Sequence, residues 1–599
     1  MARYMADFET TSDTNDCRVW ASAIIDIDKV YEHNYGDTLH VWNDIDGLFS
    51  FLNSLDGEHQ CYFHNLKFDG VFILDKLMRD YGFKYDDKLE SENTISCMIS
   101  EMGAFYQIRV RFNDKPVLTK SGKQKMKKGQ PMKVPTIIAF RDSLKKIPLS
   151  ASQIAKAYDL EESKLEIDYK AKREIGHELT NEERDYIVVD IVIVAKALHQ
   201  LFSEGMEKLT MSSDALNDFK LRLAHQNEKT KEDVFRTFFP ELSVEMDKFI
   251  RKAYKGGYTY TNPKFANQIH KQGLVYDVNS LYPSQMQQKP LPYGFPIPYM
   301  GLYQPNKNYP LFIQSLECEF QLKEGYLPTV QIKNNARFRQ TEYLTESDGL
   351  VELTMTSVDL AIFLEHYHIK NVRWIGGFMF KEHTGFFEEY INHWGEVKKK
   401  STGGKRQLAK LMLNSLYGKF ASSTDNLNKV PYIDERGLIN FVVIQDEDRK
   451  PVYTPLACFV TAYARDVMIR SAQACYDRFA YCDTDSLNIL GYEIPNIDID
   501  HKRLGAWKCE GVFNKAKYVR AKTYIEDFLT IDGKPIETPI DINQCNGTHM
   551  EVKCCGMPES SKVHVTYDNF KVGSVFPDKL MPRRVKGGIV LVETNFSIN

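Results

Sequence analysis

The sequence predicts a multidomain α+β protein, on the basis of its length, its composition and the order of its secondary-structure patterns. At about 150 residues per domain, 599 residues correspond to roughly four domains. The chain is 43% hydrophobic and 26% charged, and its 23 prolines follow no repeat, which excludes a collagen, a coiled coil or a disordered chain. Short β-type runs mix with helical stretches in the first third, and hairpin patterns alternate with helices further on.

The overall charge does not favour a polyanionic partner. Lysine and arginine total 77 against 81 acidic residues, a net charge of −4, so any nucleic-acid site must be a local basic surface. The 11 cysteines show no disulfide-scaffold spacing and indicate reduced thiols. The start of the chain lacks a signal-peptide pattern, and no apolar run approaches the ~18 residues of a membrane span. We therefore expect a soluble intracellular protein.

The elements of the first third can be placed in order. Thr180 and Glu183 form a capping box before an apolar stripe of helical spacing, which predicts a helix from 181 onward, although the β-branched residues also allow a strand. On a helix, Tyr186 and Asp190 share another face. Strands are predicted upstream, at 19–27, 61–64, 105–112 and 136–140.

The middle of the chain contains several turn signals. Residues 115–133 hold seven lysines and no acid, broken by proline and glycine; we favour a solvated hairpin tip, with a DNA-contacting loop as the alternative. The proline-rich segment 290–310 marks a boundary. Gly403 and Gly404 open a predicted helix that Gly418 is expected to end, and residues 425–455 predict a β-hairpin.

Four carboxylates of the first third form a candidate metal site. Asp7 and Glu9 are two apart on a predicted strand and leave its same face, Asp69 follows the strand at 61–64, and Asp190 lies on the predicted helix. Such a set can hold two Mg²⁺ ions about 4 Å apart, which suits phosphodiester hydrolysis. Taken singly, each residue also fits a solvated strand edge, a helix cap or an exposed helix position.

A second candidate site combines Asp277 with Asp485. Asp277 lies near the end of a predicted strand before a turn and a helix, and Asp483 and Asp485 project together from the tip of a predicted hairpin. Asp277 and Asp485 could clamp Mg²⁺ and a nucleoside triphosphate, although aspartate is common in ordinary turns.

The predicted helix 405–419 carries the positive charge that a triphosphate site needs. Lys410, Asn414 and Tyr417 share one face, and an apolar face opposite them can pack. A solvated basic helix is the alternative, but it explains Asn414 and Tyr417 poorly.

The motifs of the first third resemble the three 3′–5′ exonuclease motifs of family B DNA polymerases. They are residues 7–11, residues 64–70, and Tyr186 with Asp190. The resemblance implies that Asp7, Glu9, Asp69 and Asp190 are metal ligands, that Tyr186 orients the attacking water, and that Lys164 is the catalytic lysine upstream. It also implies a set of residues that hold the single-stranded primer end: Thr10, His64, Asn65, Phe68, Ser143, Leu144 and Tyr169.

The later motifs, at 274–283, 410–418 and 481–486, resemble the polymerase motifs of the same family. With two further matches at 254–257 and 522–524, they resemble the protein-primed branch, polymerases of the phage phi29 kind. The resemblance implies two Mg²⁺ ions per active site, or Mn²⁺, held here by Asp277, Val278 and Asp485 with Asp483 in support. It implies nucleotide contacts from Val278, Tyr282, Lys398, Lys410, Asn414 and Tyr417, and DNA contacts from Tyr254, Gly256, Gly257, Lys522 and Tyr524.

The same resemblance implies a domain layout: a ribonuclease-H-like exonuclease domain, then palm, fingers and thumb with two palm insertions. The expected partners are primer-template DNA, dNTPs and a terminal priming protein, the enzyme being otherwise monomeric in the host cytoplasm and not at a membrane. The lysine-rich loop and the acidic net charge depart from the family pattern. The implied ranges are 1–210 exonuclease, 211–288 palm, 289–385 insertion contacting the priming protein, 386–421 fingers, 422–454 hairpin insertion for processivity and strand displacement, 455–555 palm and 556–599 thumb.

Three alternatives stay open. Cys545, His549, Cys554 and Cys555 offer soft ligands, but their spacing is not that of a usual zinc finger, so buried thiols are favoured over zinc. For the whole chain, the enzymatic alternative is a nuclease with a degenerate polymerase half. The non-enzymatic alternative is a DNA-binding replication scaffold.

Overall fold

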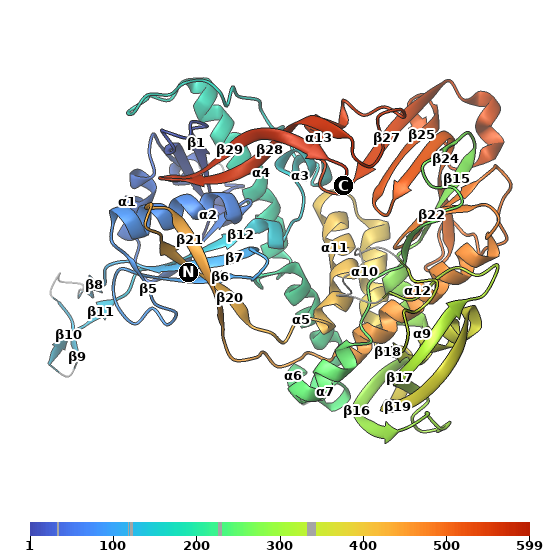
Figure 1. The fold of residues 1–599 in the computed structure, drawn as a ribbon. Helices are drawn as coiled ribbons and strands as arrows, with labels where there is room; N and C mark the ends of the chain where they lie inside the picture. Colours follow the sequence, from blue (N-terminus) through green and yellow to red (C-terminus); the bar gives the residue numbers. More distant parts are fainter. Residues whose placement is uncertain (33–34, 118, 120–123, 128, 226–229, 332–342) are drawn as a thin grey trace.

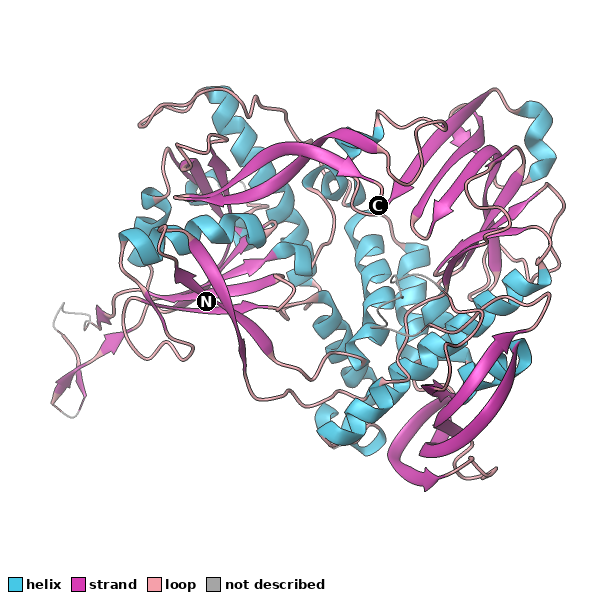
Figure 2. Ribbon diagram, viewed as in Figure 1, coloured by secondary structure: helices cyan, strands magenta, loops and turns pink. Residues whose placement is uncertain are grey.

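The protein consists of two sheet-containing lobes with a group of helices between them (Figures 1 and 2). The structure is a computed structural model and describes residues 1–32, 35–117, 119, 124–127, 129–225, 230–331 and 343–599. The N-terminal lobe and the C-terminal lobe are each built on one large sheet, and each sheet carries one of the two carboxylate sets predicted from sequence.

The sheet of the N-terminal lobe has eight strands, in the order β3-β2-β1-β4-β12-β7-β6-β5. β1 runs antiparallel to β2 and parallel to β4, so the strand that carries Asp7 and Glu9 lies inside the sheet. The four strands predicted upstream of residue 181 are confirmed. The bounds are β1 Arg3–Thr10, β2 Val19–Asp26, β3 His40–Trp42, β4 Glu58–Phe63, β5 Lys84–Tyr85, β6 Thr94–Ile99, β7 Phe105–Arg111 and β12 Ile137–Asp142.

The long helix α4, Asn181–Ser203, packs against β1 and β2 and confirms the helix prediction over the strand. Thr180 Oγ1 accepts from the Glu183 backbone N–H at 3.2 Å, and Glu183 Oε2 accepts from Thr180 N–H at 3.1 Å, so the capping box fixes where the helix begins. By length and composition α4 could cross a membrane, but 67% of its most apolar window is buried inside the protein. Its apolar side is therefore the surface that covers the sheet.

The sheet of the C-terminal lobe has nine strands. Its main path is β13-β22-β23-β15-β24-β25-β26, with β14 paired to β24 and β27 to β25. The apolar face of helix α12, Thr454–Ala474, packs on this sheet through Met468 and Ile469. The bounds are β13 Thr259–Thr261, β14 Ile269–His270, β15 Gly273–Val278, β22 Phe479–Asp483, β23 Ser486–Leu490, β24 Trp507–Arg520, β25 Thr523–Ile531, β26 Lys534–Pro535 and β27 Gly547–Cys554.

Three helices stand between the lobes: α5 Met211–Leu223, α10 Glu388–Lys400 and α11 Gly403–Phe420 (Figure 1). The sequence predicts that α11 ends at Gly418, and this is wrong, because the helix continues to Phe420. Phe420 is completely buried and contacts the rings of Phe219 and Phe387. Burial of this ring outweighs the ~1 kcal/mol that glycine costs inside a helix.

A separate four-stranded sheet, β16-β19-β17-β18, lies between β15 and α10 in the chain. The proline-rich segment predicted to be a boundary forms the edge strand β16, Leu291–Met300. An edge strand tolerates prolines because one side of it needs no N–H donors. β16 pairs with β19 Tyr367–His383. The segment also contains β17 Leu311–Leu322, β18 Val351–Thr356 and helix α9 Ser357–His366, and its residues 332–342 lie outside the described residues.

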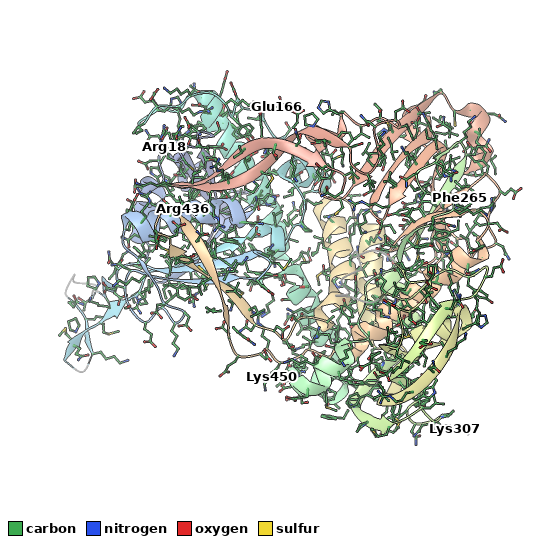
Figure 3. All side chains as sticks on the ribbon, in the orientation of Figure 1. Arg18, Glu166, Phe265, Lys307, Arg436 and Lys450 are labelled. Carbon is green, nitrogen blue, oxygen red and sulfur yellow. The ribbon has the colours of Figure 1, made fainter. Side chains whose placement is uncertain are left out.

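Two β-hairpins extend to the N-terminal lobe. The hairpin predicted at 425–455 is confirmed as β20 Leu427–Ile433 and β21 Ile439–Gln445, and β28 Val575–Val585 and β29 Gly588–Ser597 form the second. Arg436, labelled in Figure 3, is at the turn of the first hairpin, beside the N-terminal lobe. The two hairpins touch, because Arg584 donates from Nη1 to the Ile439 carbonyl at 3.1 Å.

The ends of both hairpins are part of the N-terminal core. Ile439, Ile589 and Val590 are buried in one cluster with residues of β4 and of helix α2, Leu66–Asp75. A Cβ atom on Gly587 would lie 2.0 Å from the Cys17 carbonyl oxygen, so only glycine permits this approach.

The lysine-rich segment forms an arm that projects from the N-terminal lobe (Figure 1). Its described residues form two short ribbons: β8 Lys115–Pro116 with β11 Lys133–Val134, and β9 Met126–Lys127 with β10 Gln130–Pro131. The predicted hairpin is thus confirmed, while residues 118, 120–123 and 128 lie outside the described residues.

Candidate active sites

The four carboxylates of the N-terminal lobe come from three elements that meet beside the sheet. Asp7 and Glu9 lie on β1, Asp69 in the first turn of α2 and Asp190 on α4. Glu9, Asp69 and Asp190 are buried and Asp7 is half-buried. The simpler explanations, a solvated edge, a cap and an exposed helix position, therefore do not fit.

The electrostatics indicate that these carboxylates lie close to one another. Burial raises the pKa of Asp7 to about 7, with a further contribution from Asp190. Burial and then Asp7 raise the pKa values of both Glu9 and Asp69 well above their usual range. The group therefore holds more negative charge than its surroundings neutralise.

A divalent cation fits this donor set. Asp190 Oδ1 is buried and makes no hydrogen bond within the described part of the chain. Carboxylate oxygens are what Mg²⁺ and Mn²⁺ bind, and a cation would neutralise the repelling charges. Among the described residues no three acidic, histidine or cysteine side chains already surround one point, as expected for carboxylates that repel one another.

Lys164 and Tyr186 lie beside Asp190. Lys164 Nζ lies 2.9 Å from Asp190 Oδ2; burial lowers the pKa of this lysine, but Asp190 outweighs that effect and raises it. The Tyr186 hydroxyl is hydrogen-bonded to that of Tyr169. Burial raises the pKa of Tyr186, so its hydroxyl stays protonated and can donate.

The other predicted primer-end residues lie beside the pocket. His64 contacts one of them, with Nδ1 2.8 Å from Ser143 Oγ, and its Nε2 lies 2.8 Å from the Leu149 carbonyl. Asn65 precedes α2 with a positive φ of 76°. Thr10 follows Glu9 on β1, Phe68 precedes Asp69 on α2, Leu144 follows Ser143, and Tyr169 is 55% exposed.

The C-terminal lobe brings Asp277 and Asp485 together. Asp277 lies on β15, and Asp485 lies in the turn between β22 and β23; the Val278 N–H donates to the Asp485 carbonyl at 2.9 Å. Burial raises the pKa of Asp277 to about 8, with Asp485 and Glu510 adding to the shift. Burial and then Asp483 raise the pKa of Asp485. This is a second site of uncompensated carboxylates, and a divalent cation fits it for the same reason.

Asp483 differs from Asp485 in having protein partners. It accepts from Thr259 Oγ1 at 3.1 Å and is ion-paired with Lys522 Nζ. The Lys522 N–H donates to Tyr481 Oη at 2.9 Å, and the Tyr524 ring lies 4.8 Å from that of Tyr481. Asp483 therefore ties segment 522–524 to the turn that carries Asp485.

The helices between the lobes place basic and aromatic groups opposite this pair. Tyr282, on helix α8 Leu281–Gln288, stacks on Tyr417 of α11 with ring centroids 4.1 Å apart. Lys398 Nζ donates to Ser280 Oγ at 3.3 Å, and its pKa is lowered by burial and by nearby Arg406 and Lys410.

The two predicted faces of α11 are confirmed. Lys410 and Asn414 are exposed, whereas Leu408 and Met412 are buried. The exposed face is free to meet a ligand.

The loop at 254–257 passes close to the turn that carries Asp485 and to Tyr282. A Cβ atom on Gly257 would lie 2.9 Å from Thr484 Cγ2 and 2.9 Å from the Tyr282 hydroxyl, so the position requires glycine. Tyr254 is near enough to Tyr417 for the latter to add to the effect of burial in raising its pKa. Gly256 leaves open space where its side chain would be, within the described residues.

Sequence reasoning missed Arg465, which holds this loop. Arg465 is buried on α12, donates to the carbonyls of Lys255 and Gly256 at 2.8 Å each, and forms an ion pair with Asp359 of α9 at 2.7 Å. An arginine within the mostly apolar stretch 454–474 is the signal that could have revealed it.

The zinc alternative gains no support. Cys554 is buried and Cys555 is exposed, so the two adjacent thiols lie in different surroundings.

Comparisons with known proteins decide the family. A family model described as "DNA polymerase type B, organellar and viral" matches residues 53–504. The chain belongs to this family. It is 45% identical to the DNA polymerase of Bacillus phage B103 over 99% of both chains, and 43% identical to that of Bacillus phage phi29, covering 99% of this chain and 98% of the relative. The DNA polymerase of Streptococcus phage Cp-1 is 33% identical, with the same coverage.

Solved structures agree with this assignment. A structure described as phi29 DNA polymerase complexed with primer-template DNA has a TM-score of 0.90 at 41% identity, and 100% of each chain is covered. One described as the ternary complex with primer-template DNA and incoming nucleotide substrates has a TM-score of 0.89 at 40% identity, again over 100% of both.

The polymerase is thus of the phi29 kind, and the expected fold class and enzyme class are confirmed. As a type B DNA polymerase, it uses divalent metal ions. Its relatives are phage proteins, so it works in replication inside a host cell.

Proposed function

We propose that this polymerase copies DNA at the site of Asp277 and Asp485 and removes mispaired 3′ ends at the site of Asp7, Glu9, Asp69 and Asp190. One observation carries the proposal: each lobe holds a set of carboxylates in which burial first, and the neighbouring acids second, raise the pKa values of Asp7 and Glu9 in one lobe and of Asp277 and Asp485 in the other. Two sites of the same chemistry in one chain suit two opposed reactions on phosphodiester bonds.

In synthesis, the primer 3′-hydroxyl attacks the α-phosphate of a dNTP and pyrophosphate leaves. Two divalent cations, Mg²⁺ or Mn²⁺, supply charge neutralisation at the attacking and leaving oxygens when bound to Asp277, Val278 and Asp485. Lys398 and Lys410, together with Asn414, attract and orient the triphosphate from α10 and α11. Tyr282, backed by Tyr417, lies beneath the sugar and excludes a ribose 2′-OH.

In proofreading, the N-terminal lobe hydrolyses the terminal nucleotide. The protonated Tyr186 hydroxyl orients water, and Lys164 limits the negative charge around Asp190. A frayed primer end lies along the residues beside the pocket, where the half-exposed Tyr169 ring can stack on a base. The same primer strand reaches the C-terminal lobe along Tyr254, Gly256, Gly257, Lys522 and Tyr524.

The DNA and nucleotide partners follow from the two sites, and a terminal priming protein is the third partner. Protein priming needs a surface that a second protein can bind, and the segment 289–385 offers one. Phe295 is 58% exposed, Met300 87% and Leu302 45%, all on or next to its edge strand β16. Exposed apolar side chains grouped in this way favour a protein partner over DNA, which remains the alternative for this segment.

The remaining segments of the chain are assigned to the domains that the family resemblance implies. The hairpin within 422–454 and the C-terminal segment 556–599 flank the path of DNA, and their contact at Arg584 supports a closed arrangement that favours processive, strand-displacing synthesis. The enzyme is proposed to be monomeric apart from its priming partner and to act in the host cytoplasm.

The decisive experiment is primer extension by Asp485→Asn on a primed single-stranded circle with four dNTPs. We expect a loss of at least three orders of magnitude, which corresponds to about 4 kcal/mol of transition-state stabilisation, with degradation of single-stranded DNA retained. Asp477→Asn, at an exposed acid of the same lobe, is the control. Extension by Asp485→Asn within tenfold of wild type would contradict the assignment.

Protein priming is tested separately. Wild type should form a 1:1 complex with the terminal protein and transfer labelled dNMP to it, and a variant with residues 289–382 replaced by a short linker should not, while both extend an ordinary primer. Equal labelling by both proteins would remove the segment from priming, and no labelling by wild type with either metal would mean ordinary primer use.

A further inference from the structure

A pocket of about 370 Å³ lies on the N-terminal lobe at the end of helix α1, Asp46–Ser54. Its walls are aromatic: Phe49, Phe83 and Phe112 are buried, and Tyr81 is 42% exposed. The volume falls within the range of small-ligand sites, about 300 to 1,000 Å³. None of these residues belongs to the carboxylate site of the same lobe, so the pocket is separate from that site.

The rest of the lining is polar: Ser50 and the amides of Asn53, Asn93 and Asn113. Asn53 Oδ1 is buried and makes no hydrogen bond to any described residue. Buried polar atoms almost always have a partner, so this oxygen lacks one that a ligand would provide. Aromatic walls with amide donors and acceptors match the faces and edges of a nucleobase.

The lysine-rich arm rises directly beside this pocket. Lys115 Nζ donates to the Leu55 carbonyl at 2.6 Å and lies 3.3 Å from Asp56, two and three residues after Asn53. Lys133 Nζ lies 3.3 Å from Glu92, next to Asn93. Both ends of the arm are therefore attached at the rim of the pocket, and these pairs neutralise two of the acids there.

The outer part of the arm carries unneutralised positive charge. The ribbon of β9 and β10 is exposed along both strands, and Lys125 and Lys127 take part in no ion pair among the described residues. Figure 1 shows the ribbon standing away from the rest of the protein. A polyanion would neutralise this charge.

We propose that the pocket and the described ribbon of β9 and β10, with Lys125 and Lys127, form one binding site for single-stranded DNA. A base enters the mouth of the pocket and packs against the exposed Tyr81 ring, and the phosphates that follow it lie along Lys125 and Lys127. The strand must be single, because a paired and stacked base cannot enter a pocket. The inference rests on the proposed function in that DNA is the substrate, but the site lies outside both carboxylate sites.

Two variants of the full-length polymerase test the two halves of the site. Lys125→Gln with Lys127→Gln removes the charge of the arm. Ser50→Trp fills the pocket from an exposed position on α1, which leaves the core unchanged. The matched control is Lys29→Gln with Lys156→Gln, which removes two exposed lysines elsewhere in the lobe.

Binding is measured in EDTA, so that no strand is degraded, with three primer-templates: one with a 5′ flap of twenty thymidines on the downstream strand, one with a twenty-thymidine template overhang, and one with a two-nucleotide gap. We expect each test variant to bind a substrate with a long single strand about tenfold more weakly, with the gap substrate and gap filling unchanged. For the lysine variant, the slope of log affinity against log salt should fall by about 0.7 per lysine.

The pattern of binding losses across the three substrates identifies which single strand of DNA the site binds. A loss on the flap alone indicates the displaced strand, a loss on the overhang alone the incoming template, and a loss on both a general single-strand site. Unchanged affinity for both, or an equal loss on the gap substrate, overturns the proposal. Failure of wild type to fill the gap would instead contradict the polymerase function on which the proposal rests.

Discussion

The rings of Tyr282 and Tyr417 lie parallel, with centroids 4.1 Å apart and planes 15° apart. They come from α8 and α11, so one stacking contact joins the helix after the Asp277 strand to the helix that presents Lys410. A displacement of α11 would separate the rings, and the floor of the nucleotide site would then be incomplete.

Loss of this stack should weaken nucleotide binding more than the chemical step. Aromatic pairs contribute about 0.5–1.5 kcal/mol beyond area burial, so Tyr282→Ala should raise the KM for dNTPs up to about tenfold and increase ribonucleotide incorporation. Steady-state kinetics with dNTPs and rNTPs measure both. Tyr282→Phe keeps the stack and should retain the wild-type KM; equal effects of the two substitutions would mean that the hydroxyl, not the stack, is what matters.

The two carboxylate sites should be separable by mutation, because they lie in different lobes. Asp7→Ala combined with Glu9→Ala removes two of the four carboxylates near Asp69 and Asp190, and we expect 3′–5′ degradation to be abolished while primer extension is largely retained. A gel assay of single-stranded and primed substrates measures both activities. Equal loss of both in a folded double variant would show that the sites are not independent.

The close contact at Gly257 predicts a position-specific effect. Gly257→Ala places a methyl group 2.9 Å from Thr484 Cγ2 and from the Tyr282 hydroxyl, which displaces the Asp485 turn or the nucleotide floor. We expect extension to fall at least tenfold while single-strand degradation persists. Gly256→Ala meets no described atom within 4 Å and is the matched control; the explanation fails if both variants behave alike.

The hairpin of β20 and β21 should matter for passage through duplex DNA. Deletion of residues 425–452 removes its contact with Arg584 and its insertion into the N-terminal core, so products on a primed circle should shorten while short gaps are still filled. Product length on a denaturing gel is the measurement. Long strand-displaced products from the deletion variant would exclude this role.

A buried carboxylate in the C-terminal sheet predicts a pH dependence of stability. Glu526 accepts hydrogen bonds from Tyr518 and Asn488, and burial raises its pKa from 4.5 to about 7. The folded state therefore holds a proton that the unfolded state has lost, and stability falls as the pH rises from 4.5 to 7, by up to roughly 3 kcal/mol. Glu526→Gln stays neutral, so its unfolding free energy should lack this decline and exceed that of wild type above pH 7; parallel pH profiles in denaturant melts would refute the assignment.

Much of the local structure could be predicted from sequence because it depends on neighbouring residues. The capping box of Thr180 and Glu183, the two faces of α11 and the hairpin turn after Ile433 are local patterns, and each is present. The end of α11 could not be predicted, because Phe420 is held by rings distant in sequence.

In the candidate sites too, features that depend on neighbouring residues could be predicted, and those that depend on distant residues could not. Sequence motifs such as residues 481–486 identify the side chains of a site. Only the fold shows that Asp483 is ion-paired with Lys522, whereas the negative charge of Asp485 has no such ion pair among the described residues. Arg465 was missed because its partners, Lys255, Gly256 and Asp359, lie far from it in sequence.

The burial of Ile439, Ile589 and Val590 in the N-terminal core has a consequence for biosynthesis. A ribosome makes the N-terminal lobe first. However, the core residue Ile439, and then Ile589 and Val590, are synthesised only much later in the chain. Until then the apolar surface that receives them on β4 and α2 is exposed to water or to other chains. The first lobe therefore completes its folding last. A shortened gene product that ends before residue 588 would retain the carboxylates of both proposed active sites but expose an apolar surface that favours aggregation.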